Sequence, residues 1–113
     1  MGYIAKHNYA PISPRKARLI VDLVRGKSVD DALSALRRQP QRGARLLEKV
    51  VKSALANAED RGEENVVNLK VWRAWVDESR RLWKMTPRAR GRMVWICKRL
   101  CHIGVELVAQ RGS

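Results

Sequence analysis

The fold of this chain is decided by residues 80–105, RRLWKMTPRARGRMVWICKRLCHIGV, in which strand-like patterns stand on both sides of an Arg-rich turn. No Asp or Glu occurs in this stretch, and its turn-forming centre is Pro87–Arg92. Like charges at this density repel one another unless a polyanion neutralises them. The planar guanidinium fork of Arg matches phosphate oxygens bidentately. The stretch therefore indicates a nucleic-acid partner before any fold is considered.

The segments on either side of the turn have the two-residue period of β-strands. Apolar residues alternate with polar ones from Val67 to Val71, and the apolar parity shifts at Trp72. This shift predicts either a β-bulge or a change of packing partner. The second segment, about 93–108, carries one apolar face made of Cys101, Ile103, Val105 and Leu107. The simplest arrangement of the two segments is one antiparallel hairpin over about residues 65–108.

This hairpin is too long for the body that carries it. An arm of about 13 residues or more spans on the order of 45 Å, whereas a globule of about 90 residues is only about 30 Å across. The outer half of the hairpin should therefore protrude, with an Arg-rich tip near residues 79–92. An isolated two-stranded ribbon is marginal in water, so it needs a partner, and its charges indicate a polyanion.

Residues 1–64 predict a strand followed by three helices. Ser13 followed by Pro14 is a helix start, because Ser caps the first turn and Pro fits its first position. The expected elements are an extended segment at Tyr3–Ile12, a helix from Ser13 to Gly26, a helix from Ser28 to Arg38 and a helix from Gln41 to Ala58. The third helix has an apolar stripe made of Ala44, Leu47, Val51, Ala54, Leu55 and Ala58.

The expected fold class is α+β. The 113 residues form one domain, in which three helices pack on a short antiparallel sheet and a long β-hairpin protrudes at about residues 65–108. Residues 1–64 supply the N-terminal strand and the helices, and residues 65–108 supply the two-stranded arm.

The charge is spread over the whole chain. Its formal net charge is +13, and twelve of the 24 Lys and Arg residues lie in residues 1–60. This distribution favours a large anionic partner that contacts several faces. A membrane is the rival polyanion, but no run of about 18 apolar residues is present to span one, and the N-terminus lacks the apolar region of a signal peptide. Arg15, Lys16 and Arg18 crowd the first turn of a helix, where the dipole opposes cations and phosphate contacts would offset the cost.

Cys97, Cys101 and His102 raise the question of a zinc site. On one strand His102 and Cys101 point to opposite faces, so the three side chains cannot converge on a metal. Along a strand the two cysteines would lie about 13 Å apart, which is too far for a disulfide. We expect no metal and no cofactor, with Cys101 as a small core residue and His102 as a polar contact to RNA or to the backbone.

No nucleophile, base and orienting residue form a recognisable catalytic set, so no enzyme is expected. The adjacent acids Asp77 and Glu78 are interpreted as charge balance for Arg73 and Arg80.

Other classes of protein stay open as alternatives. A DNA-binding protein would use Pro14–Arg25 and Asp30–Arg38 as a helix-turn-helix, although this leaves the hairpin unexplained and puts acids where base-reading residues should lie. A small RNA-processing enzyme needs turnover, for which the chain offers no site. A disordered basic tail at residues 80–92 is disfavoured, because strand patterns flank it.

The chain resembles the family of the twenty-second protein of the large ribosomal subunit, in its bacterial form. The matching segments are Ile12–Lys16, Val24–Ser28, Arg42–Ala44, Ser53-Ala54, Ala56–Ala58, Val76–Glu78, Pro87–Arg92 and His102-Ile103. The resemblance covers essentially all of residues 3–108. The chain differs from the family at Ser79-Arg80, where Gly-Pro is frequent, and at Trp83, where a basic residue is usual.

The resemblance implies a structural constituent of the large subunit that binds and cross-links its ribosomal RNA. It implies a small domain on the outside of the subunit near the nascent-peptide exit, and a hairpin that reaches through RNA to line the exit tunnel. The tip would lie beside the fourth large-subunit protein and would meet the nascent peptide transiently. The resemblance also implies the ribosome of the bacterial cytoplasm, with neither a membrane nor a second copy of the chain as partner.

Aromatic side chains could stack on RNA bases, as they do in RNA-binding modules. Trp72 and Trp75 belong to the strand nearest the helices, where core packing is the better interpretation. Trp83 stands in the basic region with few apolar neighbours, so we expect it to stack on a base or to face the tunnel lumen. Trp95 could stack as well.

These arguments define two sets of candidate residues. The residues expected to bind ribosomal RNA are Arg15, Lys16, Arg18, Lys27, Arg42, Arg45, Lys52, Arg73, Arg80, Arg81, Arg88, Arg90, Arg92, Lys98, Arg99 and His102. The residues expected to line the tunnel at the tip are Leu82, Trp83, Lys84, Met85, Thr86, Pro87, Ala89 and Gly91.

Overall fold

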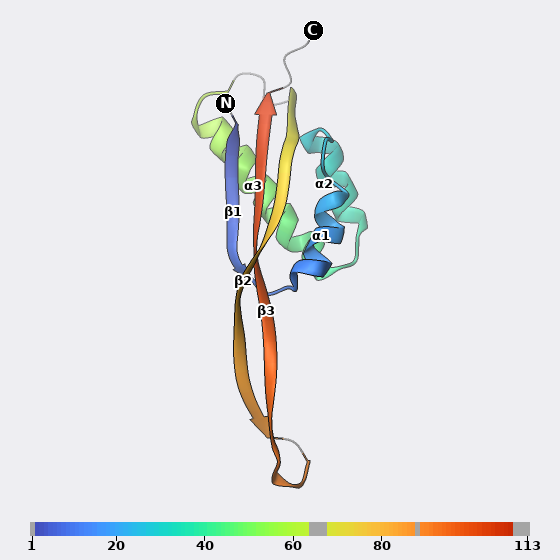
Figure 1. Ribbon diagram of the computed structural model, residues 1–113. Coiled ribbons are helices and arrows are strands. Elements are labelled where there is room, and N and C mark those ends of the chain that lie inside the picture. Colours follow the sequence, from blue (N-terminus) through green and yellow to red (C-terminus); the bar gives the residue numbers. More distant parts are fainter. Residues whose placement is uncertain (1, 64–67, 88, 110–113) are drawn as a thin grey trace.

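The computed structural model describes residues 2–63, 68–87 and 89–109 (Figure 1). The strands of this part are β1 (Tyr3–Ala10), β2 (Leu69–Pro87) and β3 (Met93–Ala109), and its helices are α1 (Pro14–Asp22), α2 (Val29–Arg38) and α3 (Arg42–Asp60). A single helical turn, Ala89–Gly91, lies between β2 and β3. The α+β class that the sequence predicts is therefore confirmed.

The strands form one antiparallel sheet in the order β1-β3-β2, so β3 is central. β1 covers β3 only as far as Cys101, whereas β2 pairs with β3 along its whole length, up to Pro87 opposite Met93. The predicted antiparallel hairpin is confirmed. The beginning of its first strand, predicted at residues 65–67, lies outside the described residues.

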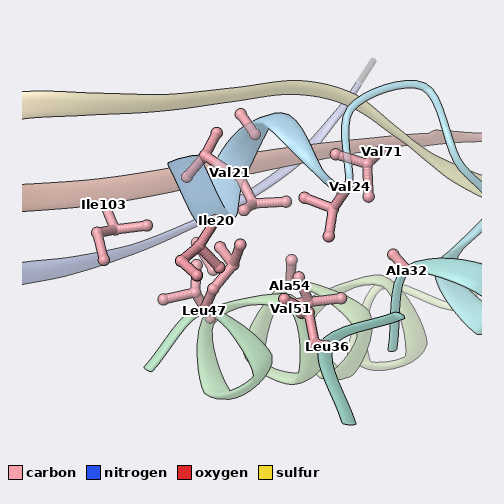
Figure 2. Close-up of a cluster of buried hydrophobic side chains, with 14 of the residues drawn as sticks. Ile20, Val21, Val24, Ala32, Leu36, Leu47, Val51, Ala54, Val71 and Ile103 are labelled. Atoms are coloured by element: carbon pink, nitrogen blue, oxygen red, sulfur yellow. The ribbon is translucent and has the colours of Figure 1, made fainter. Parts of the chain in front are cut away.

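The helices cover one face of the sheet, and the hydrophobic core lies between the two layers (Figure 1). The predicted inner face of β3 is confirmed, because its residues Cys101, Ile103, Val105 and Leu107 are at most 1% exposed. Figure 2 shows these layers meeting through Ile20, Val21, Val24, Ala32, Leu36, Leu47, Val51, Ala54, Val71 and Ile103. Each fully buried Leu, Ile or Val side chain stabilises the fold by about 1.5–3 kcal/mol.

Two serines start the first two helices, as the sequence predicts. The Ser13 hydroxyl accepts a hydrogen bond from the N–H of Lys16 at 3.5 Å, and the Ser28 hydroxyl accepts one from the N–H of Asp31 at 3.3 Å. Both serines have extended backbone angles, as N-cap residues do.

The predicted helix ends need small corrections. α1 ends at Asp22, before the predicted stop at Gly26. Gly26 has a φ of 78° and donates its N–H to the carbonyl of Val71 at 3.0 Å, so it ends the turn after the helix and joins the sheet. α3 continues past the predicted Ala58 to Asp60.

Beyond the end of β1 the hairpin continues as two strands alone (Figure 1). We call residues 81–99 the arm and the rest of the described chain the body. The molecule measures 66 × 26 × 19 Å. None of the buried core residues of the described chain belongs to the arm. The protrusion predicted from the length of the hairpin is therefore confirmed.

The turn of the arm is shorter than the tip predicted near residues 79–92. The strand ladder continues to Pro87 opposite Met93, so most of this segment is paired strand. Arg90 and Gly91 have φ angles of 65° and 73°, in the left-handed region that reverses the chain. Charged residues before Pro87 conceal the strand pattern in the sequence, because an arm without a core needs no apolar alternation.

The predicted core packing of Trp72 and Trp75 is wrong. The register shifts between Val71 and Arg73, as the bulge alternative predicts, and this shift leaves Trp72 exposed while Val71 stays in the core. Trp75 is half-buried, and it covers Gly104 on the face of the sheet that points away from the helices.

Candidate nucleic-acid interface

A groove of about 940 Å³ lies where the starts of α1 and α3 meet the base of the arm. Apolar side chains that include Ile12 line part of it. Its cationic lining residues are Lys16, Arg42, Lys98 and Arg99, and no Asp or Glu of the described chain lines it. Three segments far apart in sequence thus bring cations to one hollow, which we call the basic groove.

Two helix starts contribute to the basic groove. Lys16 stands in the first turn of α1 and Arg42 in the first turn of α3. Each start presents the positive end of a helix dipole, which favours anions. A Cβ atom at Gly43 would come within 2.5 Å of the Cδ1 atom of Ile12, so glycine lets α3 lie against the segment that precedes α1.

The conflict predicted at the first turn of α1 is present. Arg15, Lys16 and Arg18 are exposed, and this turn carries no acidic residue. Within the described chain, none of the three forms an ion pair. The dipole of α1 therefore opposes these charges without compensation from the protein, which favours an external anion.

Arg45 and Lys52 contact groups of the protein itself. The Arg45 guanidinium donates to the carbonyls of Leu36 at 2.6 Å and Gln39 at 2.7 Å, at the C-terminal end of α2, and to Glu48 at 3.0 Å. The Nζ atom of Lys52 lies 3.1 Å from the Oε1 atom of Glu48. The hydrogen bond from Lys52 lowers the pKa of Glu48, and nearby positive charges lower it further against the effect of burial.

Arg73 also has a partner within the protein. Its Nε atom donates to the Glu106 carboxylate at 2.8 Å. The sequence interpretation gave Asp77 and Glu78 as charge balance for Arg73 and Arg80. For Arg73 the partner is a different acid, because the register places Arg73 directly opposite Glu106.

His102 accepts a backbone hydrogen bond, one of the two contacts that the sequence predicts for it. Its Nδ1 atom accepts the N–H of Tyr9 at 3.1 Å, and the two rings meet edge to face with centroids 4.9 Å apart. Tyr9 has a φ of 57° and lies in the register shift between His7 and Ala10. The contact fixes the end of β1 where the arm leaves the body.

The remaining predicted RNA-binding cations are on the surface. Lys27, Arg42, Arg81, Arg90, Arg92, Lys98 and Arg99 are exposed, and none forms an ion pair within the described chain. Arg88 lies outside the described residues, as do the side chains of Arg80, Leu82 and Ala89.

The residues predicted to form the tip divide between strand and turn. Trp83, Lys84, Met85, Thr86 and Pro87 lie in β2, and Gly91 lies in the turn. Because of this, the tip set does not form one surface: alternate strand residues point to opposite faces of the arm.

Sequence reasoning did not find two features of the surface. It missed the apolar part of the basic groove, which includes the exposed Leu19 of α1. It also missed that Met93 and Trp95 share a face with Trp83 and Met85, as the strand register shows. The signal for this face is the spacing of these residues on either side of a turn at Arg90.

The cysteines are both free thiols, with Cys97 half-buried and Cys101 in the core. Burial raises the pKa of the Cys101 thiol, an effect that the charge of Arg18 partly offsets. In the described residues no three His, Cys, Asp or Glu side chains gather as a metal site would require. The same residues contain no helix with the length and apolarity needed to cross a membrane.

The fold and the surface together define a class of protein. A basic groove on a small α+β body and a cationic arm without acidic residues are the features of a structural RNA-binding protein.

The family follows from comparison with known proteins. Residues 5–108 match the family described as ribosomal protein L22p/L17e, and the chain belongs to this family. The resemblance found in the sequence is thereby confirmed. The chain is a structural constituent of the large ribosomal subunit and binds ribosomal RNA. Its family is one of structural proteins and not of enzymes, which decides against the RNA-processing enzyme. The ribosomal RNA partner of the family decides against the DNA-binding alternative.

Proposed function

We propose that the arm lines the nascent-peptide exit tunnel while the body binds ribosomal RNA on the outside of the subunit near the tunnel exit. The lining segment comprises residues 82–87 with Ala89 and Gly91. Its partners are the fourth large-subunit protein beside the tip and, transiently, the nascent peptide. The protein then acts on ribosomes in the bacterial cytoplasm.

The observation that carries this proposal is the composition of the unsupported part of the hairpin. The arm consists of two strands without a third, and residues 80–105 contain no acid to balance its cations. A two-stranded ribbon is marginal in water, and both of its edges leave backbone groups unpaired. Folded RNA would supply phosphates for the cations and polar groups for the edges.

The separation of the basic surfaces supports cross-linking of RNA. The basic groove lies at the base of the arm, the turn lies at its far end, and the whole molecule is 66 Å long. A protein that holds phosphates at both places joins RNA segments that are distant in the RNA sequence. Every phosphate that it neutralises releases counterions, so binding should weaken strongly with salt.

The main RNA contacts are assigned to the cations without a partner in the described chain. They are Arg15, Lys16, Arg18, Lys27, Arg42, Arg81, Arg90, Arg92, Lys98 and Arg99. Arg80, next to the arm, and Arg88, within it, are assigned from the sequence alone. Arg45, Lys52, Arg73 and His102 contribute less, because groups of the protein already engage them.

A charge-matched pair of triple variants tests the RNA contacts. Changing Arg88, Arg90 and Arg92 to Ala should make the slope of log affinity against log salt less negative by about 2–3, measured with large-subunit ribosomal RNA. Changing Arg37, Arg38 and Lys49 to Ala removes equal charge from the body and should leave the slope nearly unchanged. An equal change of the salt slope in both variants would show that the attraction is non-specific, and it would contradict the proposed contacts.

Site-specific crosslinking tests the tunnel wall. A photo-reactive residue in place of Lys84, on the arm, should crosslink to a stalled nascent chain in assembled ribosomes. The same residue in place of Lys49, on α3 of the body, should not. Ribosomes in which no position of the arm reaches the nascent chain would rule out the tunnel assignment.

A further inference from the structure

One face of the arm carries four large apolar side chains. The register sets Trp83 opposite Cys97, Met85 opposite Trp95, and Pro87 opposite Met93. Directly paired residues share a face and alternate residues along a strand return to it. We call the face formed by Trp83, Met85, Met93 and Trp95 the aromatic face. The two indoles are diagonal neighbours across the strands, at a spacing of about 7–8 Å.

These side chains are exposed. Trp83 and Trp95 are 58% and 60% exposed, and Met85 and Met93 are exposed beside them. The helices of the body do not reach this part of the hairpin (Figure 1). A contiguous apolar surface that stays in water marks an interaction site more often than a solvated surface.

The tryptophans of the body differ from those of the arm. Trp72 is as exposed, at 57%, but Lys70 lies over its ring at 5.6 Å. The ring centroid of Trp75 lies 6.0 Å from the Nζ atom of Lys6 and 5.6 Å from the Cζ atom of Arg73. In the described chain no cation and no other ring lies against Trp83 or Trp95. The indole rings of Trp83 and Trp95 are therefore both available to stack on a partner.

The surroundings of the aromatic face indicate what that partner is. Arg81 and Arg99 are paired on the same face at its inner end, and Arg90 and Arg92 stand in and after the turn at its outer end. An aromatic platform between two groups of cations matches a single-stranded stretch of nucleic acid, whose bases stack while its phosphates contact the cations. A nascent peptide offers no regular series of planar rings and anions.

We infer that Trp83 and Trp95 stack on unpaired bases of large-subunit ribosomal RNA. This inference rests on the proposed function, in which the arm lies within RNA. The arm is then held by stacking as well as by phosphate contacts. Within the proposed lining segment, Lys84 and Thr86 belong to the opposite face of the ribbon. In this inference that face is turned toward the lumen, whereas Trp83 and Met85 face RNA.

Tryptophan fluorescence of the full-length protein gives a direct test, because large-subunit ribosomal RNA contributes no tryptophan signal. One variant, Trp72→Phe with Trp75→Phe, keeps only the arm indoles. The matched variant, Trp83→Phe with Trp95→Phe, keeps only the body indoles. On binding the RNA, the first variant should lose most of its emission and its accessibility to acrylamide. The second should change little.

Affinity measurements provide a second readout. Trp83→Ala with Trp95→Ala should weaken binding roughly 10-fold or more, since each stacked base contributes appreciably, while the salt slope stays unchanged. Phe at both positions should recover most of the affinity. Trp72→Ala, which removes an equally exposed indole from the body, should change affinity less than about twofold.

The outcomes separate the stacking inference from the proposed function. Arm indoles that stay open to acrylamide in the RNA complex, while the Arg88, Arg90 and Arg92 triple variant still changes the salt slope, would overturn stacking alone. They would instead favour contact of the aromatic face with the nascent peptide. Open indoles together with an unchanged salt slope would show that the arm does not enter RNA, and both proposals would fail.

Discussion

The indole of Trp75 lies directly over Gly104 of β3. A Cβ atom at Gly104 would come within 2.3 Å of the Cε2 atom of this ring. The two residues are register partners across β2 and β3, so the ring covers the backbone of the central strand at the point where a side chain is absent. Tryptophan on the outer face of the sheet thus replaces a covering element, because the helices lie on the other face.

This contact predicts that Gly104→Ala destabilises the free protein by about 1–3 kcal/mol, since the methyl group must displace the ring. Urea unfolding of the purified protein measures the change. In a Trp75→Ala background the same substitution should have an effect below about 0.5 kcal/mol, because the obstacle is gone. Equal effects in the two backgrounds would show that the ring is not the cause.

Arg42 and Arg45 offer a comparison between neighbouring cations with different roles. Arg45→Ala should destabilise the protein by about 1–2 kcal/mol, because the carbonyls of Leu36 and Gln39 lose their donor. Its effect on the salt slope of RNA binding should be small. Arg42→Ala should do the reverse, with stability nearly unchanged and the slope reduced by about 1. Urea unfolding and salt titrations of RNA binding distinguish them, and exchanged results would reverse the two assignments.

Local signals in the sequence were sufficient for the helices and for the existence of the hairpin. Ser13 and Ser28 cap their helices through contacts that span three residues, so the sequence alone reveals them. The alternation of apolar residues from Cys101 to Leu107 likewise indicates one buried face, because the helices cover only one face of the sheet. The bulge at Trp72 was also visible as a shift of parity.

Features that depend on pairing between distant residues could not be predicted. The face occupied by Trp75 depends on the bulge geometry and on Gly104 across the ladder. The partner of Arg73 depends on the same register, which sets it opposite Glu106. The basic groove needs three segments whose relative positions follow only from packing. Local sequence patterns therefore predict the helices and strands, whereas the positions of side chains on the surface depend on how the strands pair.

The pair formed by Glu48 and Lys52 predicts a pH-dependent contribution to stability. The pKa of Glu48 is lowered in the folded protein, chiefly by the hydrogen bond from Lys52. A lowered pKa means that this stabilisation is present above the unfolded-state pKa and is lost as the pH falls through the folded-state pKa. Lys52→Gln should therefore destabilise the protein by about 0.3–0.5 kcal/mol at neutral pH.

The difference between wild type and Lys52→Gln should vanish in acid, once Glu48 is protonated in both. Urea unfolding at a series of pH values measures it. Lys49→Gln is the control, because Lys49 is exposed and forms no ion pair in the described chain. A Lys52 effect that persists unchanged in acid would mean that it does not act through the Glu48 charge.

The arm should be dispensable for folding and required for RNA binding. Replacing residues 81–99 with Asn-Gly shortens the hairpin to a tight turn that suits the strand twist. Because the arm contributes no core residue in the described chain, the free energy of unfolding should change by less than about 1 kcal/mol. Leu47→Ala, by contrast, leaves a cavity in the core and should destabilise the protein by about 2–5 kcal/mol.

The same shortened protein should bind large-subunit ribosomal RNA more weakly and with a less negative salt slope, because the cations of the arm are absent. Its remaining affinity reports the basic groove, which keeps Lys16 and Arg42 but loses Lys98 and Arg99. Changing Lys16 and Arg42 to Ala in the shortened protein should then remove most of the residual salt dependence. Loss of cooperative unfolding on shortening would contradict the separation into a self-sufficient body and an arm that RNA supports.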